Sequence, residues 1–206
     1  MSLDHYVYNK FFNQYNSGVM VEVGSAGPDF LSQSKYFRNM GWRCICIEPN
    51  PKFVEMHKHI GNEIYQYACS NLDKDDIDFE LVNVNNGNIS NESFSALSVL
   101  EDVVKISGYS DKEYFDIEKI KVNVRKLDTI LKESGLSHVD YVTIDVEGWE
   151  LTVMEGFSTE IYKPKVIVLE NNLPSEYEEY NKYMESKGYS FDSISETNFV
   201  YVNTTY

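Results

Sequence analysis

The chain has 206 residues, of which 42% are hydrophobic, and it carries a formal net charge of −15. This length fits one domain (1–206) with a full hydrophobic core, and the aromatic content argues against disorder. The negative charge argues against nucleic acid or an anionic membrane surface as partner, and no apolar run approaches the ~20 residues of a membrane span. Residues 1–12 lack the features of a signal peptide, and three cysteines suggest a reducing compartment, so we expect a cytoplasmic protein whose cysteines are buried.

Strands and helices alternate in the first part of the chain. Residues 1–18 are expected to form a helical N-terminal segment. Gly41 and Gly61 end two predicted helices, and Pro51 lies in the first turn of the second one. The hydrophobic patterns predict strands at 19–25, 43–50 and 63–70, and helices at 29–41 and 51–61.

The second part begins with a less regular region. A strand, expected to be antiparallel, is predicted at 77–85, and the variable region 83–120 is long enough for an insert or a substrate lid. The alternation then resumes, with strands at 121–125, 141–144 and 165–172, helices at 126–135 and 175–188, and a closing strand pair at 189–195 and 198–204. Alternating strands and helices predict an α/β fold with a mostly parallel sheet, whereas the three residues that join the last two strands permit only an antiparallel hairpin.

Polar residues follow nearly every predicted parallel strand. In an open α/β sheet ligands bind at the carboxyl ends of the strands, so this arrangement predicts a binding site. The residues at these ends are Glu22 to Ser25, Glu48 to Asn50, Ala68 to Ser70, Asp145 to Gly148 and Glu170 to Asn172.

Two of these ends favour a nucleoside ligand. The loop "EVGSAGPD" would let a ligand approach closely at Gly24 and Gly27. Ala26 and Asp29 stand where a dinucleotide-binding loop would have glycines, which disfavours NAD. Glu48 is placed to accept hydrogen bonds from two ribose hydroxyls, and Glu22 suits an amine better than a pyrophosphate. These features favour S-adenosylmethionine, and the absence of a GxxxxGK[ST] motif excludes a P-loop enzyme.

The chain resembles the FkbM-type family of S-adenosylmethionine-dependent methyltransferases. The matching stretches are "VEVGSAG", "IEPNP", "VNVRKLDTIL", "VDYVTIDVEGWELTVMEG" and "KVIVLE", in family order. The resemblance implies a Rossmann-like class I methyltransferase fold, with a seven-stranded sheet whose last strand is antiparallel and helices on both faces. It also implies methyl transfer to oxygen, often on a sugar or natural product. One departure is Pro28, where the family loop usually has a glycine.

The resemblance also implies the cofactor contacts. The methionyl end of S-adenosylmethionine is expected at the glycine loop, the ribose at the second strand end and the adenine at the third. The residues are Glu22, Gly24, Ser25 and Gly27 at the loop, Glu48, Pro49 and Asn50 at the second strand end, and Ala68, Cys69 and Ser70 at the third.

The remaining acids are candidates for catalysis. A hydroxyl acceptor must lose its proton to a base or a metal-bound group. Asp145 is the first candidate for orienting or deprotonating the acceptor, with Glu147 and Glu170 beside it. Glu147 could equally cap the following helix, and Glu150 is expected on the surface or behind the other acids. Whether the reaction requires a divalent metal stays open, because paired carboxylates also bind hard cations.

Three functions therefore stay under consideration. The first is an O-methyltransferase that acts on a small hydroxylated molecule. The alternatives are an NAD-dependent oxidoreductase and a catalytically silent domain that binds S-adenosylmethionine or another protein.

Overall fold

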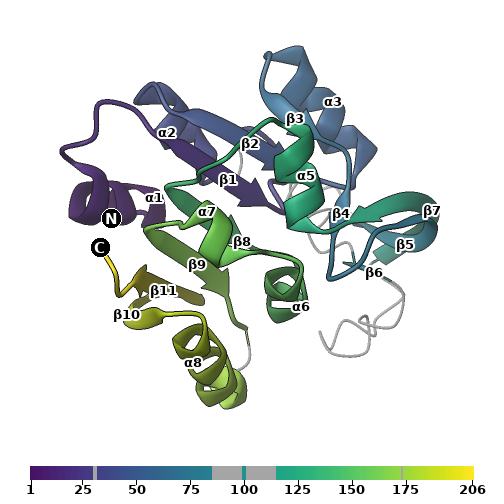
Figure 1. The fold of residues 1–206 in the computed structure, drawn as a ribbon. Helices are drawn as coiled ribbons and strands as arrows, with labels where there is room; N and C mark the ends of the chain where they lie inside the picture. Colours follow the sequence, from purple (N-terminus) through teal and green to yellow (C-terminus); the bar gives the residue numbers. More distant parts are fainter. Residues whose placement is uncertain (30–31, 85–98, 101–114, 173) are drawn as a thin grey trace.

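The fold is an α/β sandwich built on a seven-stranded sheet (Figure 1). A computed structural model describes residues 1–29, 32–84, 99–100, 115–172 and 174–206. The strand order is β10-β11-β9-β8-β1-β2-β3. The neighbouring strands β3, β2, β1, β8 and β9 are parallel to one another. By contrast, β11 is antiparallel to both β9 and β10. The predicted sheet and its closing hairpin are therefore confirmed.

The elements follow one another in the predicted alternation. The strands of the main sheet are β1 (Val19–Val23), β2 (Arg43–Ile47), β3 (Glu63–Tyr65), β8 (Tyr141–Ile144), β9 (Val166–Glu170), β10 (Tyr189–Ser195) and β11 (Asn198–Asn203). The helices are α1 (Leu3–Val7), the π-helix η1 (Tyr8–Phe12), α2 (Ser34–Asn39), α3 (Pro51–His59), α5 (Leu127–Glu133), α6 (Glu150–Glu155), α7 (Thr159–Tyr162), the 3₁₀-helix η2 (Pro174–Glu176) and α8 (Tyr177–Ser186). None of these helices is long and apolar enough to cross a membrane, within the residues described.

Helices cover both faces of the sheet because its central strands carry apolar residues on both sides. On one face, side chains from α1, η1 and α2 pack against alternate residues of the strands, such as Met20, Cys44 and Val168. On the other face, side chains from α5, α6, α7 and α8 pack against the intervening residues, such as Val21 and Ile45. The three cysteines are free and buried, as expected from the sequence.

The N-terminal helix is joined to the far edge of the sheet. Lys10 donates to Asp192 of β10 with an Nζ–Oδ2 distance of 2.7 Å, and the Tyr6 hydroxyl donates to the same carboxylate at 3.0 Å. Residues close to the N-terminus therefore lie beside the C-terminal hairpin (Figure 1).

Two predicted elements are wrong in their extent. The strand predicted at 63–70 is split into β3 and β4 (Ala68–Cys69), which belong to different sheets. The helix predicted at 29–41 begins only at Ser34. The start of this helix is fixed by a residue of β1. The Glu22 carboxylate accepts hydrogen bonds from the N–H groups of Gln33 and Ser34 and so holds the first turn of α2 in place.

A second sheet lies beside α5 and α6, with the strand order β4-β7-β5-β6 (Figure 1). It contains β5 (Lys74–Val84), β6 (Val99–Leu100) and β7 (Phe115–Arg125), and β5 is antiparallel to β7 as the sequence suggested. The interior of the region 83–120, where an insert or lid is expected, lies mostly outside the described residues.

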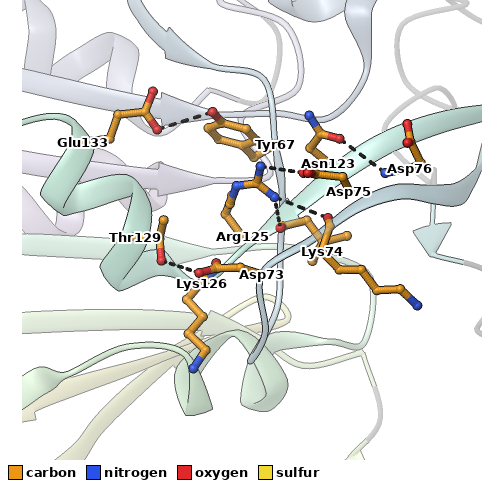
Figure 2. Close-up of polar contacts among 11 residues, drawn as sticks. Tyr67, Asp73, Lys74, Asp75, Asp76, Asn123, Arg125, Lys126, Thr129 and Glu133 are labelled. Atoms are coloured by element: carbon orange, nitrogen blue, oxygen red, sulfur yellow. Dashed lines mark hydrogen bonds and ion pairs between the residues drawn. The ribbon is translucent and has the colours of Figure 1, made fainter.

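Polar contacts join this second sheet to helix α5, which packs on the main sheet (Figure 2). The Asp73 carboxylate accepts from the Lys126 N–H at 2.8 Å and from the Thr129 hydroxyl at 2.9 Å. Asp73 therefore caps the N-terminus of α5 from a distant part of the chain, as an N-cap residue does locally. Nearby, Arg125 pairs with Asp75 at 2.6 Å on the surface.

We expect Asp73→Ala to lower the free energy of unfolding by about 1 kcal/mol, because two groups at the start of α5 lose their acceptor. Urea unfolding measures this effect. Asp75→Ala is the matched control, since an exposed ion pair contributes only about 0–1 kcal/mol. Equal losses in the two variants would contradict the capping role.

Candidate active site

The sheet brings the predicted strand-end residues to one level. The last paired residues of four neighbouring strands are register partners, namely Val23, Ile47, Ile144 and Leu169. The next residue of each strand is Gly24, Glu48, Asp145 and Glu170, respectively. These four residues therefore lie side by side along the carboxyl edge of the sheet, where α/β proteins bind ligands.

The loop after β1 is held tightly by the protein itself. The N–H groups of Gly24 and Ser25 both donate to the Ile47 carbonyl, at 2.9 and 3.2 Å. The Ala26 N–H donates to Glu48 Oε2 at 3.0 Å. These three N–H groups already have acceptors, so in this conformation a ligand would meet the loop through other groups, such as its carbonyl oxygens.

Glu48 and His57 hold Ala26 from opposite sides. Ala26 adopts a left-handed conformation, with φ of 44°, which is unfavourable for a residue with a side chain. Glu48 accepts its N–H, and the buried His57 ring lies 3.0 Å from its carbonyl oxygen through Nε2. Because the Ala26 carbonyl can only accept a hydrogen bond, the Nε2 atom carries the proton, and Nδ1 is then the acceptor for the Asn62 amide at 3.0 Å. Burial lowers the pKa of His57, which keeps the ring neutral. Sequence reasoning missed this role for His57.

Glu48 has the environment expected of a ligand-binding carboxylate. It is buried, and its protein partners are backbone N–H groups, of Ala26 and, at 2.8 Å, of Asn50. No cation pairs with it in the part of the chain that the structure describes. Burial raises the pKa of Glu48 to about 7. Each carboxylate oxygen can accept a second hydrogen bond, so the residue fits a ligand that offers two hydroxyl donors.

Glu22 makes its contacts on another side of the loop. Its carboxylate accepts from the Gln33 and Ser34 N–H groups and from the Ser32 hydroxyl, and burial raises its pKa. In this conformation Glu22 supports the start of α2, whereas the sequence favoured direct contact with an amine.

The other predicted cofactor residues surround the same edge. Asn50 caps α3 by accepting from the Lys52 N–H at 3.0 Å, Pro49 is half-buried beside it, and Gly27 packs near Phe53. Cys69 and Ser70 are buried, but they lie at the end of β4 in the second sheet, where the Ser70 N–H donates to Arg125. Their separation from β3 follows from the split of the predicted third strand.

Three acids form a cluster at the ends of β8 and β9. Oxygen atoms of Asp145, Glu147 and Glu170 all lie within 4.8 Å of one another. Asp145 is exposed to solvent, although many protein atoms surround it. Oε2 of Glu170 is buried and has no hydrogen-bond donor among the described residues. Such a group of acids can share a proton or hold a divalent cation.

The electrostatics of this cluster favour proton binding. Partial desolvation by the surrounding protein atoms, together with the neighbouring Glu170 carboxylate, raises the pKa of Asp145 above its usual value although the residue keeps contact with solvent. Burial and Glu170 also raise the pKa of Glu147 to about 8. Near neutral pH the cluster therefore retains a proton more readily than separate carboxylates would.

The turn after Asp145 is shaped by Glu150. This buried residue accepts from the N–H groups of Val146 and Gly148, at 3.0 and 3.1 Å, and from the Tyr180 hydroxyl at 2.9 Å. The turn brings Glu147 into a left-handed conformation, with φ of 57°. Glu150 is thus a support behind the other acids, which was one of the two positions expected for it.

Gly24 allows the first loop to contact this turn. A Cβ atom at Gly24 would lie 1.8 Å from the Asp145 carbonyl oxygen, and its φ is +78°. We expect Gly24→Ala to destabilise the protein by about 1–3 kcal/mol more than Gly41→Ala. Gly41 has a similar φ of +81° with no atom within 4 Å, so it isolates the backbone strain from the steric clash. Urea unfolding of both variants measures the difference, and equal losses would show that the two loops do not meet at Gly24.

Comparison with known proteins agrees with this geometry. The family model for the methyltransferase FkbM domain matches residues 18–191. The fold resembles the methyltransferase FkbM from Methylobacillus flagellatus KT (TM-score 0.56, 13% identity), over 91% of this chain and 44% of that one. It also resembles the METTL16 MTase domain (TM-score 0.52, 10% identity), over 98% of this chain and 66% of that one. No match was found among curated proteins.

The sheet order and the likeness to these two structures define a Rossmann-like methyltransferase fold. The chain belongs to the FkbM methyltransferase family, since the family model covers most of its length. It spans less than half of the length of the Methylobacillus protein.

Proposed function

We propose that this protein uses S-adenosylmethionine to methylate a hydroxyl group of a small molecule, of the sugar or natural-product type. The observation that carries the proposal is the buried Glu48 carboxylate at the end of β2, bonded to the loop after β1. Membership of a methyltransferase family, together with a buried acid at the end of the second strand, supports a nucleoside methyl donor over a dinucleotide.

The loop and the second strand end would hold the cofactor. Glu48 would accept hydrogen bonds from the ribose hydroxyls, while Asn50 and Pro49 keep the surrounding backbone in place. Ser25 and Gly27 would lie along the methionyl part, and Glu22 would stabilise the loop through its bonds to Ser32, Gln33 and Ser34. Cys69 and Ser70 are proposed near the adenine. When bound, S-adenosylmethionine supplies a methyl group on a positively charged sulfur.

Asp145 would orient the acceptor and take its proton. Its raised pKa brings the carboxylate closer to the proton affinity that a base needs near neutral pH. Glu147 and Glu170 would tune this proton affinity, because each places negative charge beside Asp145. The same three acids would be the ligands if the reaction requires a divalent cation.

Calorimetric titration tests the cofactor proposal directly. We expect S-adenosylmethionine and S-adenosylhomocysteine to bind with dissociation constants below millimolar, and NAD to bind much more weakly. Binding of NAD without binding of either sulfur nucleoside would overturn the proposal. Binding without methyl transfer to any acceptor would favour a catalytically silent domain.

A further inference from the structure

One face of α3 packs against the loop after β1. Phe53, Met56 and His57 stand three or four residues apart, so they share this face of the helix. A Cβ atom at Gly27 would lie 3.8 Å from Phe53 and 3.7 Å from Met56, in ordinary contact. His57 adds a polar contact, because its Nε2 atom lies 3.0 Å from the Ala26 carbonyl oxygen. The last turn of α3 is therefore joined to the loop that the proposed function assigns to the cofactor.

Asn62 stabilises the form of His57 that this contact requires. Nε2 must donate, since the Ala26 carbonyl can only accept, and Nδ1 is then free to accept from the Asn62 amide at 3.0 Å. The backbone N–H of Asn62 donates to the His57 carbonyl at 3.0 Å, which fixes the two residues relative to each other. The Ser25 hydroxyl lies farther from the same Nε2 atom, at 3.5 Å.

The conformation of Ala26 in turn determines the surroundings of Glu48. With φ of 44°, the Ala26 N–H reaches Glu48 Oε2 at 3.0 Å. This left-handed conformation is unfavourable for alanine, whereas glycine adopts it freely. The other oxygen, Oε1, accepts from the N–H of Asn50, the residue that caps α3. The start of α3 therefore contacts Glu48 directly, and its last turn acts on Glu48 through Ala26.

We propose that His57 and Asn62 are positioning residues for cofactor binding, which hold Ala26 in the left-handed conformation that orients the Glu48 carboxylate. This inference rests on the proposed function, in which Glu48 accepts hydrogen bonds from the ribose. A carboxylate that is already fixed loses less freedom when a ligand binds, so the loop contributes to affinity before the cofactor arrives. Neither His57 nor Asn62 touches the cofactor in this proposal.

Calorimetric titration of the full chain with S-adenosylhomocysteine measures the effect. His57→Leu should weaken binding about 3- to 10-fold, which is the effect of one neutral hydrogen bond. His57→Gln should restore the affinity to within about 2-fold of the wild type, because the glutamine amide can donate to the Ala26 carbonyl. His59→Leu is the matched control, since His59 is an exposed residue of the same helix, and it should bind as the wild type does. A His57→Gln protein that binds no better than His57→Leu would overturn the proposal.

A substitution at Ala26 separates positioning from a general effect of His57 on packing. Glycine needs no support in the left-handed conformation, so His57→Leu should weaken binding less than about 2-fold when Ala26→Gly is also present. An equal loss of affinity in the two backgrounds would contradict positioning through Ala26.

NMR on the wild-type chain needs no substitution in the core. A long-range ¹H–¹⁵N spectrum should show His57 as the Nε2–H tautomer. Asn62→Ala, at a half-buried residue, keeps the buried ring and so tests the pair even if His57→Leu does not fold. It should increase the share of the Nδ1–H tautomer and weaken S-adenosylhomocysteine binding about 2- to 5-fold. An Nδ1–H tautomer in the wild type would overturn the proposal.

The outcomes separate this inference from the proposed function. If the wild type binds S-adenosylhomocysteine and both His57→Leu and Asn62→Ala bind it equally tightly, the positioning role is wrong and the methyltransferase proposal stands. If the wild-type chain does not bind S-adenosylhomocysteine, both proposals fail.

Discussion

Asp145→Asn should lower the rate of methyl transfer by roughly 10²–10⁴, which is the usual contribution of a positioned base. Asparagine keeps the shape of the side chain and can accept a hydrogen bond, but it cannot take a proton from the acceptor. We expect the affinity for S-adenosylmethionine to stay within a few fold, because Glu48 and the first loop hold the cofactor in our proposal. Asp140→Asn is the matched control, since Asp140 lies at the opposite end of the same strand and bonds to Val19.

The pH dependence of this reaction should follow the cluster of acids. The raised pKa of Asp145 means that the protonated form, which cannot act as a base, persists to higher pH than for an ordinary carboxylate. The wild-type rate should therefore rise with pH until the cluster is ionised, and the Asp145→Asn rate should lose that rise. Loss of activity with EDTA, restored by Mg²⁺ or Mn²⁺, would instead assign Asp145 to a metal. Full activity of the variant on a true acceptor would remove it from the mechanism.

Glu48→Ala should weaken S-adenosylmethionine binding by roughly 2–4 kcal/mol, because the ribose loses two hydrogen bonds to a charged group. Calorimetry measures this change. The variant must first be shown to be folded by circular dichroism, since Glu48 also holds the N–H groups of Ala26 and Asn50.

Glu63→Ala is the control for Glu48, because Glu63 pairs with Arg43 on the surface at the start of β3. Its removal should leave cofactor affinity unchanged. A folded Glu48→Ala protein that binds as tightly as the wild type would exclude Glu48 from the cofactor site.

The same raised pKa values affect stability without a ligand. Burial raises the pKa of Glu48 to about 7 and that of Glu147 to about 8, so both groups bind a proton more tightly in the folded chain than in the unfolded one. Their contribution to stability is complete below about pH 4.5 and is lost as the pH rises through 7 and 8. These acids therefore destabilise the free protein at the pH where the proposed reaction needs them ionised, which is common for functional sites.

The sequence was sufficient for the main sheet because its strands and helices have distinct hydrophobic periods. The short link between β10 and β11 permitted only a hairpin, and the acids at the carboxyl ends of β8 and β9 had to meet once these neighbouring strands were parallel. The extent of some strands depends on tertiary contacts, which the sequence does not show. Residues 63–70 look like one strand, but their second half pairs with the distant β7.

The supporting residues of the site were harder to predict. The role of His57 depends on the position of Ala26 across the loop, and no local pattern encodes that contact. Glu150 carried a weak signal, because an acid at the start of α6 can reach back to the preceding turn.

The central claim is methyl transfer from S-adenosylmethionine to oxygen, and one measurement tests it most directly. The full chain is incubated with S-adenosylmethionine carrying a ¹³C-labelled methyl group and a panel of neutral and amino sugars, and the products are examined by NMR. We predict a new labelled O-methyl resonance that depends on the enzyme and is greatly reduced for Asp145→Asn. A labelled methyl group found on nitrogen or carbon, or a product formed equally well by the Asp145→Asn protein, would contradict this claim.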